Sequence, residues 1–442
     1  MDKKKLILLV WIPIILLGIL NLLTVFTPEM GFDALWYHLT LPKLWLMKRQ
    51  WFFDGGLLYY SVMPRLTETI FIPLIKFTGY IGPKFVQYLS GIGVGFLIWK
   101  ILAKLKFSTL LKSVAISLFY GTWLVSWQSG SAYIDLFRTF LETAALYFFI
   151  SGSWKKGGLF LGLAVGTKWL SLGSVAIYAL AFGLPLLLPA LFLSLPWFII
   201  AFIFTRNPIF PLFSPLLHQS FSSIGVIIKN IFLLPITVTL PFDDFLSPLI
   251  GFLVVLSTIS LFSHRELIKK IAIIGLLGSI FSVVLNPPSS RFLLPYLPAL
   301  IISSVYVISL LKDSLRNLFV YLVIISSLII LGLRIIAVKK YTPFLLGRET
   351  QNVFLTKYAA RLPGTFIDTD GYIENNLDEN SKILIDKLHN LYYFPFNYDH
   401  TSWAKLSDDY DYLITIDTNP SEIKAELLHT NNIGIQIYKI SK

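Results

Sequence analysis

The sequence contains no cysteine among its 442 residues. This absence excludes disulfide bonds, thiolate metal sites and cysteine nucleophiles, and it leaves the redox compartment undefined. Charged residues are also scarce, at 14%, whereas apolar residues make up 55% and the mean hydropathy is +0.70. Soluble domains carry about 25% charged residues. The composition therefore predicts a membrane protein.

Several sequence motifs are missing as well. The chain has no phosphate-binding loop, no HExxH motif and no GxSxG nucleophile elbow, which argues against ATP-driven, zinc-protease and serine-hydrolase chemistry. The glycines of GIGVGF at 91–96 lie inside an apolar run and indicate helix packing rather than dinucleotide binding. The net charge of +12 comes from basic residues in short loops between apolar runs, so we expect no nucleic-acid partner.

Long apolar runs are what the sequence does contain. A bilayer core of about 30 Å requires about 20 apolar residues per helix. The stretch 157–204 is long enough for three short helices, with breaks near Gly173 and between Pro185 and Pro189. With these three, we expect about eleven transmembrane helices. The apolar runs begin near Leu6, Lys84, Thr109, Ala132, Gly157, Ser247, Ile271, Phe292 and Leu318.

Basic residues recur in alternate short loops, which is the pattern of loops that face the cytoplasm. They predict a multi-pass plasma-membrane protein with a cytoplasmic N-terminus, and they place the loop 28–82 and the tail outside. MDKKK at the start is interpreted as the flank of an uncleaved first helix. The basic loops contain Lys3 to Lys5, Lys100 to Lys112, Lys155 with Lys156, His264 to Lys270, and Lys312 with Arg316.

Two regions differ from the apolar runs. Residues 64–79 in the first external loop are interpreted as a helix on the membrane surface rather than a further span. Residues 341–442 are polar and predict a small α/β domain outside the membrane, following a transmembrane domain over 1–340. In this tail we expect strands at 382–385, 412–416 and 434–440, and helices at 351–360 and 421–429.

Two aspartates fall at the external membrane boundary. Asp33 follows the first helix in GFDALWYHLTLPKLWL, and Asp135 begins a later helix in QSGSAYIDLFRTF. A carboxylate near lipid is costly, so it is paired or functional in most cases. Each acid alone fits a helix cap. Because both lie at one depth on one face among aromatic residues, a functional role gains weight.

Six further residues accompany these acids. Lys168 and Arg291, also near the outer boundary, either extend to the interface as cations or bind a phosphate group. His38 and Lys43 fit solvated positions on a surface helix, with His38 as a hydrogen-bonding or metal ligand in the alternative. Glu68 lies in an apolar segment and needs a partner, for which Arg65 is near enough.

These residues occur in motifs that resemble the GT-C fold membrane glycosyltransferases, which include protein O-mannosyltransferases and lipid A aminoarabinose transferases. The resemblance rests on the Asp33 loop, with its D-A-x-x-Y-H-L-x-L-P-K pattern, and extends over most of the chain. Arg206 and Trp169 depart from the family pattern, which has glycine and tyrosine there. The other matching segments are AYIDLFRTFLETAALYFF, GLFLGLAVGTKWL, RNPIFPLF, RFLLPYLPAL and, in the tail, GRETQNVFL and GYIENNLDENSKILI.

The resemblance implies transfer of a hexosyl or pentosyl group from a polyprenyl-phosphate carrier to a lipid, glycan or protein acceptor. Asp33 matches the catalytic acid and Asp135 the acid beside it, while Lys168 and Arg291 match positions that contact the carrier phosphate. Asn207 matches the asparagine of a conserved turn in the family pattern. Some relatives place a divalent cation between the two acids, so a metal at Asp33 and Asp135 stays open.

We therefore expect an all-α polytopic GT-C-like protein with a C-terminal α/β domain, in which Asp33 accepts the proton of the attacking hydroxyl. Two other classes fit parts of the sequence. A transporter or flippase would move the lipid-linked substrate without chemistry, but internal repeats typical of transporters are not evident. A non-catalytic assembly subunit would use the two acids only as helix caps.

Overall fold

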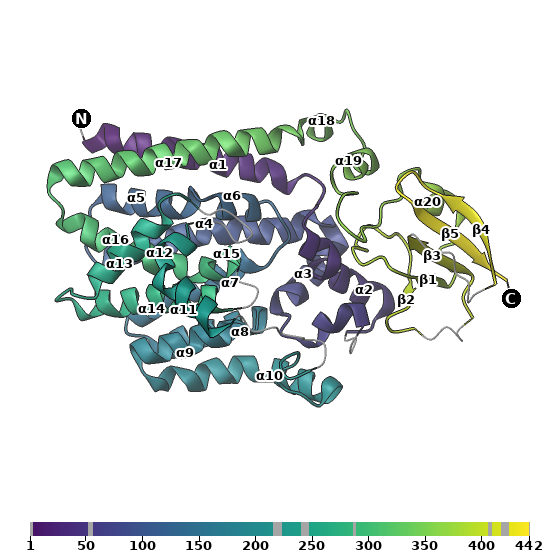
Figure 1. The fold of residues 1–442 in the computed structure, drawn as a ribbon, viewed down its shortest axis with the longest axis horizontal. Helices are drawn as coiled ribbons and strands as arrows, with labels where there is room; N and C mark the ends of the chain where they lie inside the picture. Colours follow the sequence, from purple (N-terminus) through teal and green to yellow (C-terminus); the bar gives the residue numbers. More distant parts are fainter. Residues whose placement is uncertain are drawn as a thin grey trace.

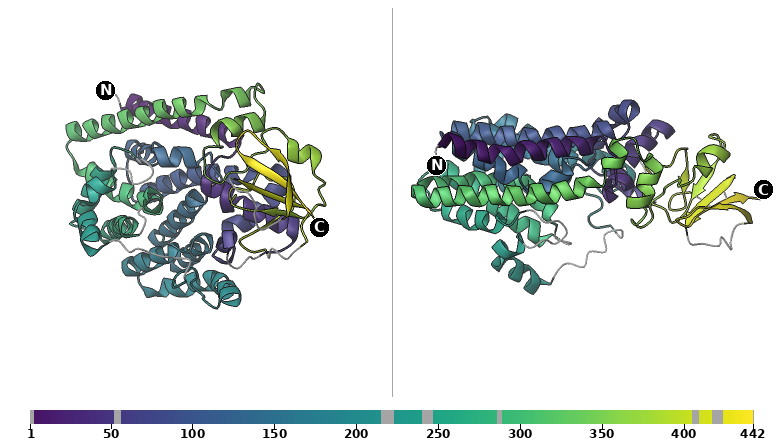
Figure 2. Two further views of the ribbon diagram at one scale, coloured as in Figure 1. Left: turned by 45° about the vertical axis from the view of Figure 1, so that its right-hand side comes forward. Right: turned by 90° about the horizontal axis from the view of Figure 1, so that it is seen from above.

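A helical bundle and a small β-sheet domain make up the protein, in a computed structural model that describes residues 3–51, 56–214, 223–239, 247–285, 289–404, 409–416 and 424–441. The sheet lies beyond one end of the bundle, which we call the sheet end (Figure 1). The long helices α1 (Lys3–Val25) and α17 (Asp313–Lys339) lie side by side in both directions of view (Figures 1 and 2). Helix α1 runs toward the sheet end, where the site residues gather.

All of the expected apolar runs are helical, but they differ in length. Among the described residues, six helical segments are long and apolar enough to cross a membrane: α1, α4 (Ile81–Lys104), Leu184–Thr205, α14 (Glu266–Val284), Ser290–Leu310 and α17. The five shorter helices that match expected spans are α5 (Thr109–Tyr120), α7 (Asp135–Ile150), α8 (Trp154–Thr167), α9 (Ser171–Phe182) and α13 (Ile250–Ser260). A multi-pass membrane fold follows, while the number of eleven spans stays a prediction.

The segment 157–204 does form three helices, but the first expected break is misplaced. Gly173 lies inside α9, and the chain turns between α8 and α9 at Lys168–Leu170 instead. A β-region backbone at Lys168 ends α8 there. Gly183, with φ +102°, then separates α9 from the segment made of η3 (Leu184–Leu186) and α10 (Leu187–Thr205). Glycine adopts this conformation without the steric cost of a Cβ atom.

The first long loop contains short helices at the sheet end of the bundle (Figure 1). A single π-helical turn, η1 (Ala34–His38), is followed by α2 (Thr40–Lys48), a 3₁₀ segment η2 (Gly56–Val62) and α3 (Leu66–Thr78). Helix α3 does not meet the length needed for a membrane span. Other short helices connect the longer ones: α6 (Trp123–Gln128), α11 (Ile224–Phe232) and α12 (Leu234–Thr237). The long apolar segment Ser290–Leu310 is made of α15 (Ser290–Leu293), η4 (Leu294–Tyr296) and α16 (Leu297–Leu310).

The tail folds as α18 (Thr342–Leu345), α19 (Gln351–Tyr358), α20 (Tyr372–Asn376) and a five-stranded sheet of order β2-β1-β3-β5-β4. Strand β1 pairs in parallel with β2 and β3, whereas β5 pairs antiparallel with β3 and β4. The apolar side chains of Leu41 and Leu44 in α2 share one buried cluster with Ile385 of β1 and Ile414 of β3. The strands are β1 (Ile383–Ile385), β2 (Asp399–His400), β3 (Tyr412–Ile416), β4 (Ala425–Thr430) and β5 (Ile435–Ile440).

The helix expected at 421–429 is wrong. Its first three residues lie outside the described part of the chain, and residues 425–430 form strand β4. The letters AELLH suit a helix by intrinsic propensity. Pairing with β5 overrides that propensity, because β5 already belongs to the sheet and offers a free edge of backbone hydrogen-bonding groups.

Candidate active site

The four residues singled out first by the sequence meet at the sheet end. The Arg291 guanidinium lies between the two acids: its Nη1 is 2.8 Å from Asp33 Oδ2, and its Nε is 3.1 Å from Asp135 Oδ2. Lys168 Nζ donates to the other oxygen of Asp135 at 2.8 Å. Two carboxylates and two cations therefore form one network from segments far apart in the sequence.

Each of these side chains sits where a regular element starts or stops. Asp33 directly precedes the π-turn η1, in which the N–H of Leu39 reaches the carbonyl of Ala34 at 2.9 Å. Asp135 is the first residue of α7, and Lys168 directly follows α8. Arg291 lies in the short helix α15. Single π-turns are rare in proteins overall, and those that occur are frequently found at functional sites. The π-turn therefore makes the Asp33 segment a candidate functional segment.

The two acids differ sharply in accessibility. The Asp33 side chain is 19% exposed, whereas the Asp135 side chain is 1% exposed. Asp135 accepts from Lys168, Arg291 and, at 3.3 Å, the Gln128 amide. Asp33 is therefore the more accessible acid, and Asp135 is enclosed by its contacts with the two cations.

Burial acts to raise the pKa of Asp33, but the charge of Arg291 and its hydrogen bond outweigh this effect and hold the pKa below its usual value. Asp33 is therefore ionised at neutral pH and able to accept a proton. Its basicity is weakened as long as Arg291 stays paired with it.

A second buried network lies beside Asp33. His38 Nδ1 and Arg65 Nη1 both contact Glu68 Oε1, at 2.6 and 2.8 Å. Arg65 is thus the partner that the sequence suggested for Glu68. The Arg65 guanidinium also lies over the rings of Tyr37 and Tyr60, 5.2 and 5.3 Å from their centroids. Because the side chains of His38 and Glu68 are 1% and 0% exposed, the solvated position expected for His38 is wrong.

Charge and burial oppose each other in this second network. Burial raises the pKa of Glu68, but Arg65 and His38 lower it to a greater extent, so the net pKa is below its usual value. Burial lowers the pKa of His38 despite the neighbouring Glu68 and Asp33. A neutral His38 that donates from Nδ1 to an ionised Glu68 is the arrangement that fits both directions.

Two residues that the sequence suggested for the site, Lys43 and Asn207, are engaged in other contacts. Lys43 donates to the carbonyls of Tyr392 and Phe394, at 2.9 and 2.6 Å, and so joins α2 to the sheet domain instead of standing in solvent. Asn207 donates to the Leu212 carbonyl at 2.5 Å and accepts from the Ile209 N–H at 3.1 Å within its own turn. The turn packs its Phe210 near Tyr59 of the first loop.

The carboxylate arrangement bears on the open question of a metal. Among the described residues, no group of three or more His, Asp or Glu side chains is placed to hold a metal ion. Three of the four carboxylate oxygens of Asp33 and Asp135 contact Arg291 or Lys168. A divalent cation between the two acids would have to displace Arg291, so we derive no chemical step through a metal.

Glu29 is a site residue that the sequence reasoning missed. Its Oε1 accepts from the N–H groups of Met30 and Gly31 and from the Ser131 hydroxyl, and its Oε2 accepts from the Ala132 N–H. One carboxylate thus joins the segment just before Asp33 to the segment just before Asp135. The only sequence hint is an acid directly after an apolar helix, which is also the hint for an ordinary interfacial residue.

A buried ion pair below the site was also missed. Arg138 Nε lies 2.8 Å from Glu142 Oε1, one turn further along α7 from Asp135. The hydroxyls of Ser171 and Ser174 donate to the two oxygens of Glu142 at 2.8 and 2.7 Å. The spacing of Arg138 and Glu142 within one helix was the available signal, because residues four apart share a face.

Comparison with known proteins identifies the fold. Two solved structures of ArnT from Cupriavidus metallidurans are similar to this chain, one bound to undecaprenyl phosphate and one in the apo state. Their TM-scores are 0.61 and 0.62 at 12% sequence identity, and each alignment covers 99% of this chain and 98% of the other. No family model and no curated protein sequence matches. The chain has the GT-C fold that its motifs led us to expect.

Proposed function

We propose that this chain transfers a sugar, a hexosyl or pentosyl group, from a polyprenyl-phosphate carrier to an acceptor hydroxyl. The observation that carries the proposal is the bridge that Arg291 makes between the accessible Asp33 and the buried Asp135. A base and a cation stand side by side at the end of an apolar bundle, as displacement of a lipid phosphate from an anomeric carbon requires. The undecaprenyl phosphate bound to the similar ArnT structure supports this donor class.

In the proposed reaction, the acceptor hydroxyl oxygen forms a bond to the anomeric carbon while the bond from that carbon to the carrier phosphate breaks. The hydroxyl proton passes to Asp33, and the electron pair leaves with the polyprenyl phosphate. Arg291 and Lys168 stabilise the charge that develops on the departing phosphate. Asp135 acts as a positioning residue, because it is too buried to meet the acceptor and contacts both cations.

Donor binding also has a consequence for the strength of the base. A donor phosphate that approaches Arg291 competes with Asp33 for the guanidinium. Asp33 then loses a neighbouring positive charge, and its pKa rises toward the range in which a carboxylate accepts a proton more readily. The resting ion pair therefore keeps the base weak until the donor is in place.

The proposed face of action is extracytoplasmic. The basic loops of the sequence support a cytoplasmic N-terminus, and α1 then ends on the outer side. Asp33 and the domain of residues 341–442 would share that side. The acceptor is a lipid, glycan or protein hydroxyl, and its identity is a separate question.

Asp33→Asn is the decisive test. We expect loss of sugar transfer by the purified full chain with radiolabelled polyprenyl-phosphate sugar, because the amide cannot take up the proton. Expression and binding of the carrier should remain close to wild type. Asp313→Asn, on a side chain that is 81% exposed, is the matched control and should leave turnover unchanged.

The same assay separates the rival functions. Retained turnover by Asp33→Asn would refute the base assignment. Carrier-dependent movement of lipid across vesicles without any product would favour a transporter or flippase. Asp135→Asn is expected to raise the KM for the donor, because the amide no longer holds Lys168 and Arg291 in position; a change confined to kcat would contradict its positioning role.

A further inference from the structure

A cationic cavity lies at the sheet end, separate from the network of Asp33, Asp135, Lys168 and Arg291. Its volume is about 300 Å³, and it is formed where α1 ends, α4 begins and α17 ends, with α6 alongside. Three of its lining side chains are cations: Lys84, Arg334 and Lys340. Glu29 is the one carboxylate among the residues that line it. The lining therefore carries two excess positive charges.

The two deepest cations contact only neutral acceptors. Lys84 and Arg334 are 1% and 4% exposed. Lys84 Nζ donates to the Thr27 carbonyl at 2.6 Å, and Arg334 donates to Asn21 Oδ1 and Thr24 Oγ1, both at 3.0 Å. Within the described residues, neither cation forms an ion pair with a carboxylate. A buried charge without a counter-charge is costly, so the cavity favours an anion.

Glu29 does not supply that counter-charge in full. Both of its oxygens already accept from the backbone of residues 30, 31 and 132 and from Ser131. It influences Lys84 only through space. The positive charge of the cavity is therefore available to a ligand with several acceptor oxygens.

Other lining groups match a phosphate at a membrane surface. Trp127 lines the cavity, and its buried indole N–H has no hydrogen-bond partner within the described part of the chain. Lys340 lies near the rings of Tyr341 and Tyr358, at 5.0 and 5.8 Å from their centroids. Tryptophan and tyrosine beside lysine or arginine are typical of the headgroup level of a bilayer. Gly130 allows its backbone to approach Thr24 closely, since a Cβ there would lie 1.9 Å from Thr24 Oγ1.

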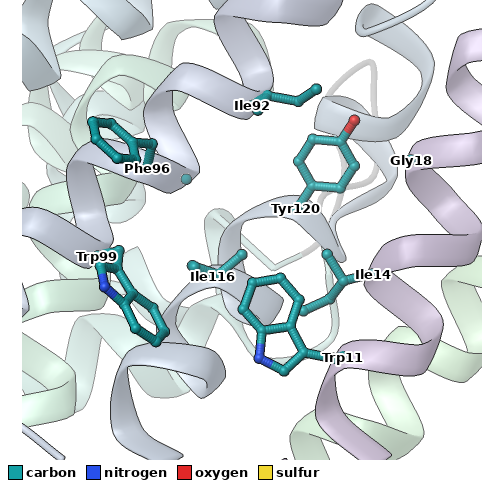
Figure 3. Close-up of a pocket in the computed structure, with 9 residues that line it drawn as sticks. Trp11, Ile14, Gly18, Ile92, Phe96, Trp99, Ile116 and Tyr120 are labelled. Carbon is teal, nitrogen blue, oxygen red and sulfur yellow. The ribbon is translucent and has the colours of Figure 1, made fainter. Parts of the chain in front are cut away.

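An apolar cavity of about 430 Å³ lies further from the sheet end, between α1, α4 and α5. Trp11 and Ile14 of α1 face Trp99 of α4 and Ile116 of α5 across it (Figure 3). Along α1, the apolar cavity reaches Gly18, and the cationic cavity begins at Thr24, about 9 Å further on. Helices α1 and α4 thus line both cavities, and α4 contributes Lys84 to the cationic one.

From these contacts we propose that the cationic cavity binds the phosphate group of an anionic phospholipid, whose acyl chain runs down toward the apolar cavity. Lys84, Arg334 and Lys340 neutralise the phosphate. The site differs from the donor site, which contains Arg291 and Lys168. Because Glu29 lines it and joins the segments of Asp33 and Asp135, an occupant here also steadies the two acids.

Binding of dioleoylphosphatidylglycerol to the purified full chain in detergent, followed by native mass spectrometry, tests the proposal. Arg334→Gln with Lys340→Gln is expected to weaken binding roughly tenfold, because two of the three cations lose their charge. The matched control is Lys339→Gln with Arg348→Gln, which removes the same charge near the same end of α17 from exposed side chains outside the cavity. The control should bind like wild type.

Several outcomes overturn the proposal. Equal lipid affinity in wild type and the Arg334/Lys340 variant would show that the cavity is not the binding site. If that variant does not fold, Lys340→Glu alone, at a half-buried position, should still weaken binding, and wild-type affinity there would count against the site. Addition of inorganic phosphate distinguishes the sources: failure to displace the lipid supports a lipid ligand, and displacement would overturn the lipid assignment in favour of a soluble anion.

Discussion

At the scale of single residues, burial distinguishes two acids that share one cation. Arg291 contacts both, but only Asp33 keeps exposed surface, and Asp135 is enclosed by Lys168, Arg291 and Gln128. The sequence treats the two aspartates alike, since both lie at the outer membrane boundary near aromatic residues. Their proposed division into a base and a positioning residue depends on burial, which is a property of the packed chain.

His38 gives a pH-dependent prediction at the same scale. Its pKa in the folded protein is below the ordinary value of 6.5, because burial disfavours the charged form. The unfolded chain therefore takes up a proton at His38 before the folded chain does. The stability contributed by the neutral side chain is fully present above pH 6.5 and is lost as the pH falls toward the folded pKa.

We expect the midpoint of thermal unfolding in detergent to fall less between pH 7 and pH 5 in His38→Asn than in wild type, because the variant lacks this titration while its amide still donates to Glu68. The measurement is a pair of unfolding curves across this pH range, and His400→Asn in the sheet domain serves as a comparison at another buried histidine. Parallel pH dependences of wild type and His38→Asn would contradict the assignment.

At the scale of elements, the glycines of α8 determine how closely two helices approach. Gly158, Gly162 and Gly166 recur at intervals of four and so lie on one face of α8. This face packs against α10, which includes Trp197. A Cβ on Gly162 would lie 2.5 Å from the Ala190 carbonyl oxygen. This packing fixes the end of α8, and with it the position of Lys168.

Gly162→Ala is therefore expected to destabilise the protein by about 1–3 kcal/mol, because the added methyl group overpacks the contact with α10. The measurement is the midpoint of thermal unfolding of the detergent-solubilised chain. Gly332→Ala in α17 is the matched control, since a Cβ there meets nothing within 4 Å and should leave the midpoint unchanged or slightly raised. Equal effects of the two substitutions would refute the packing argument.

At the scale of the whole molecule, the sheet domain is joined to the helical part through the first loop. The residues of α2 share a buried apolar cluster with β1, β3 and β5. Lys43 donates to two carbonyls of the tail, and Lys48 pairs with Asp399. The boundary that the sequence suggests at residue 340 thus separates two compositions, while the packing joins the tail to residues near Asp33.

Lys43→Gln with Lys48→Gln should loosen this junction, because the shorter neutral side chains cannot reach the carbonyls and the carboxylate in the same way. We expect faster cleavage of the sheet domain by chymotrypsin than in wild type. Lys382→Gln, an exposed lysine of the same domain, is the control and should be cleaved at the wild-type rate. Unchanged cleavage of the double variant would mean that the apolar cluster alone holds the domain.

What the sequence determined by itself was the class of fold and the four charged residues that the structure brings together. Hydrophobic length predicts helices wherever burial in lipid is the dominant energy, and an acid next to an apolar run is costly enough to stand out. Asp33, Asp135, Lys168 and Arg291 were found in this way, and the structure brings them into one network.

What only the tertiary structure decided was which partner each polar group finds. Contacts between residues that are distant along the chain decide four features that the sequence did not reveal. They are the burial of His38, the hydrogen bonds from Lys43 to the tail, the hydrogen bonds by which Glu29 joins two segments, and the strand at 425–430. Local sequence does not determine these contacts, because a short polar side chain or a weakly biased segment has nearly equal energies in several surroundings. Packing against the rest of the molecule then selects one of them.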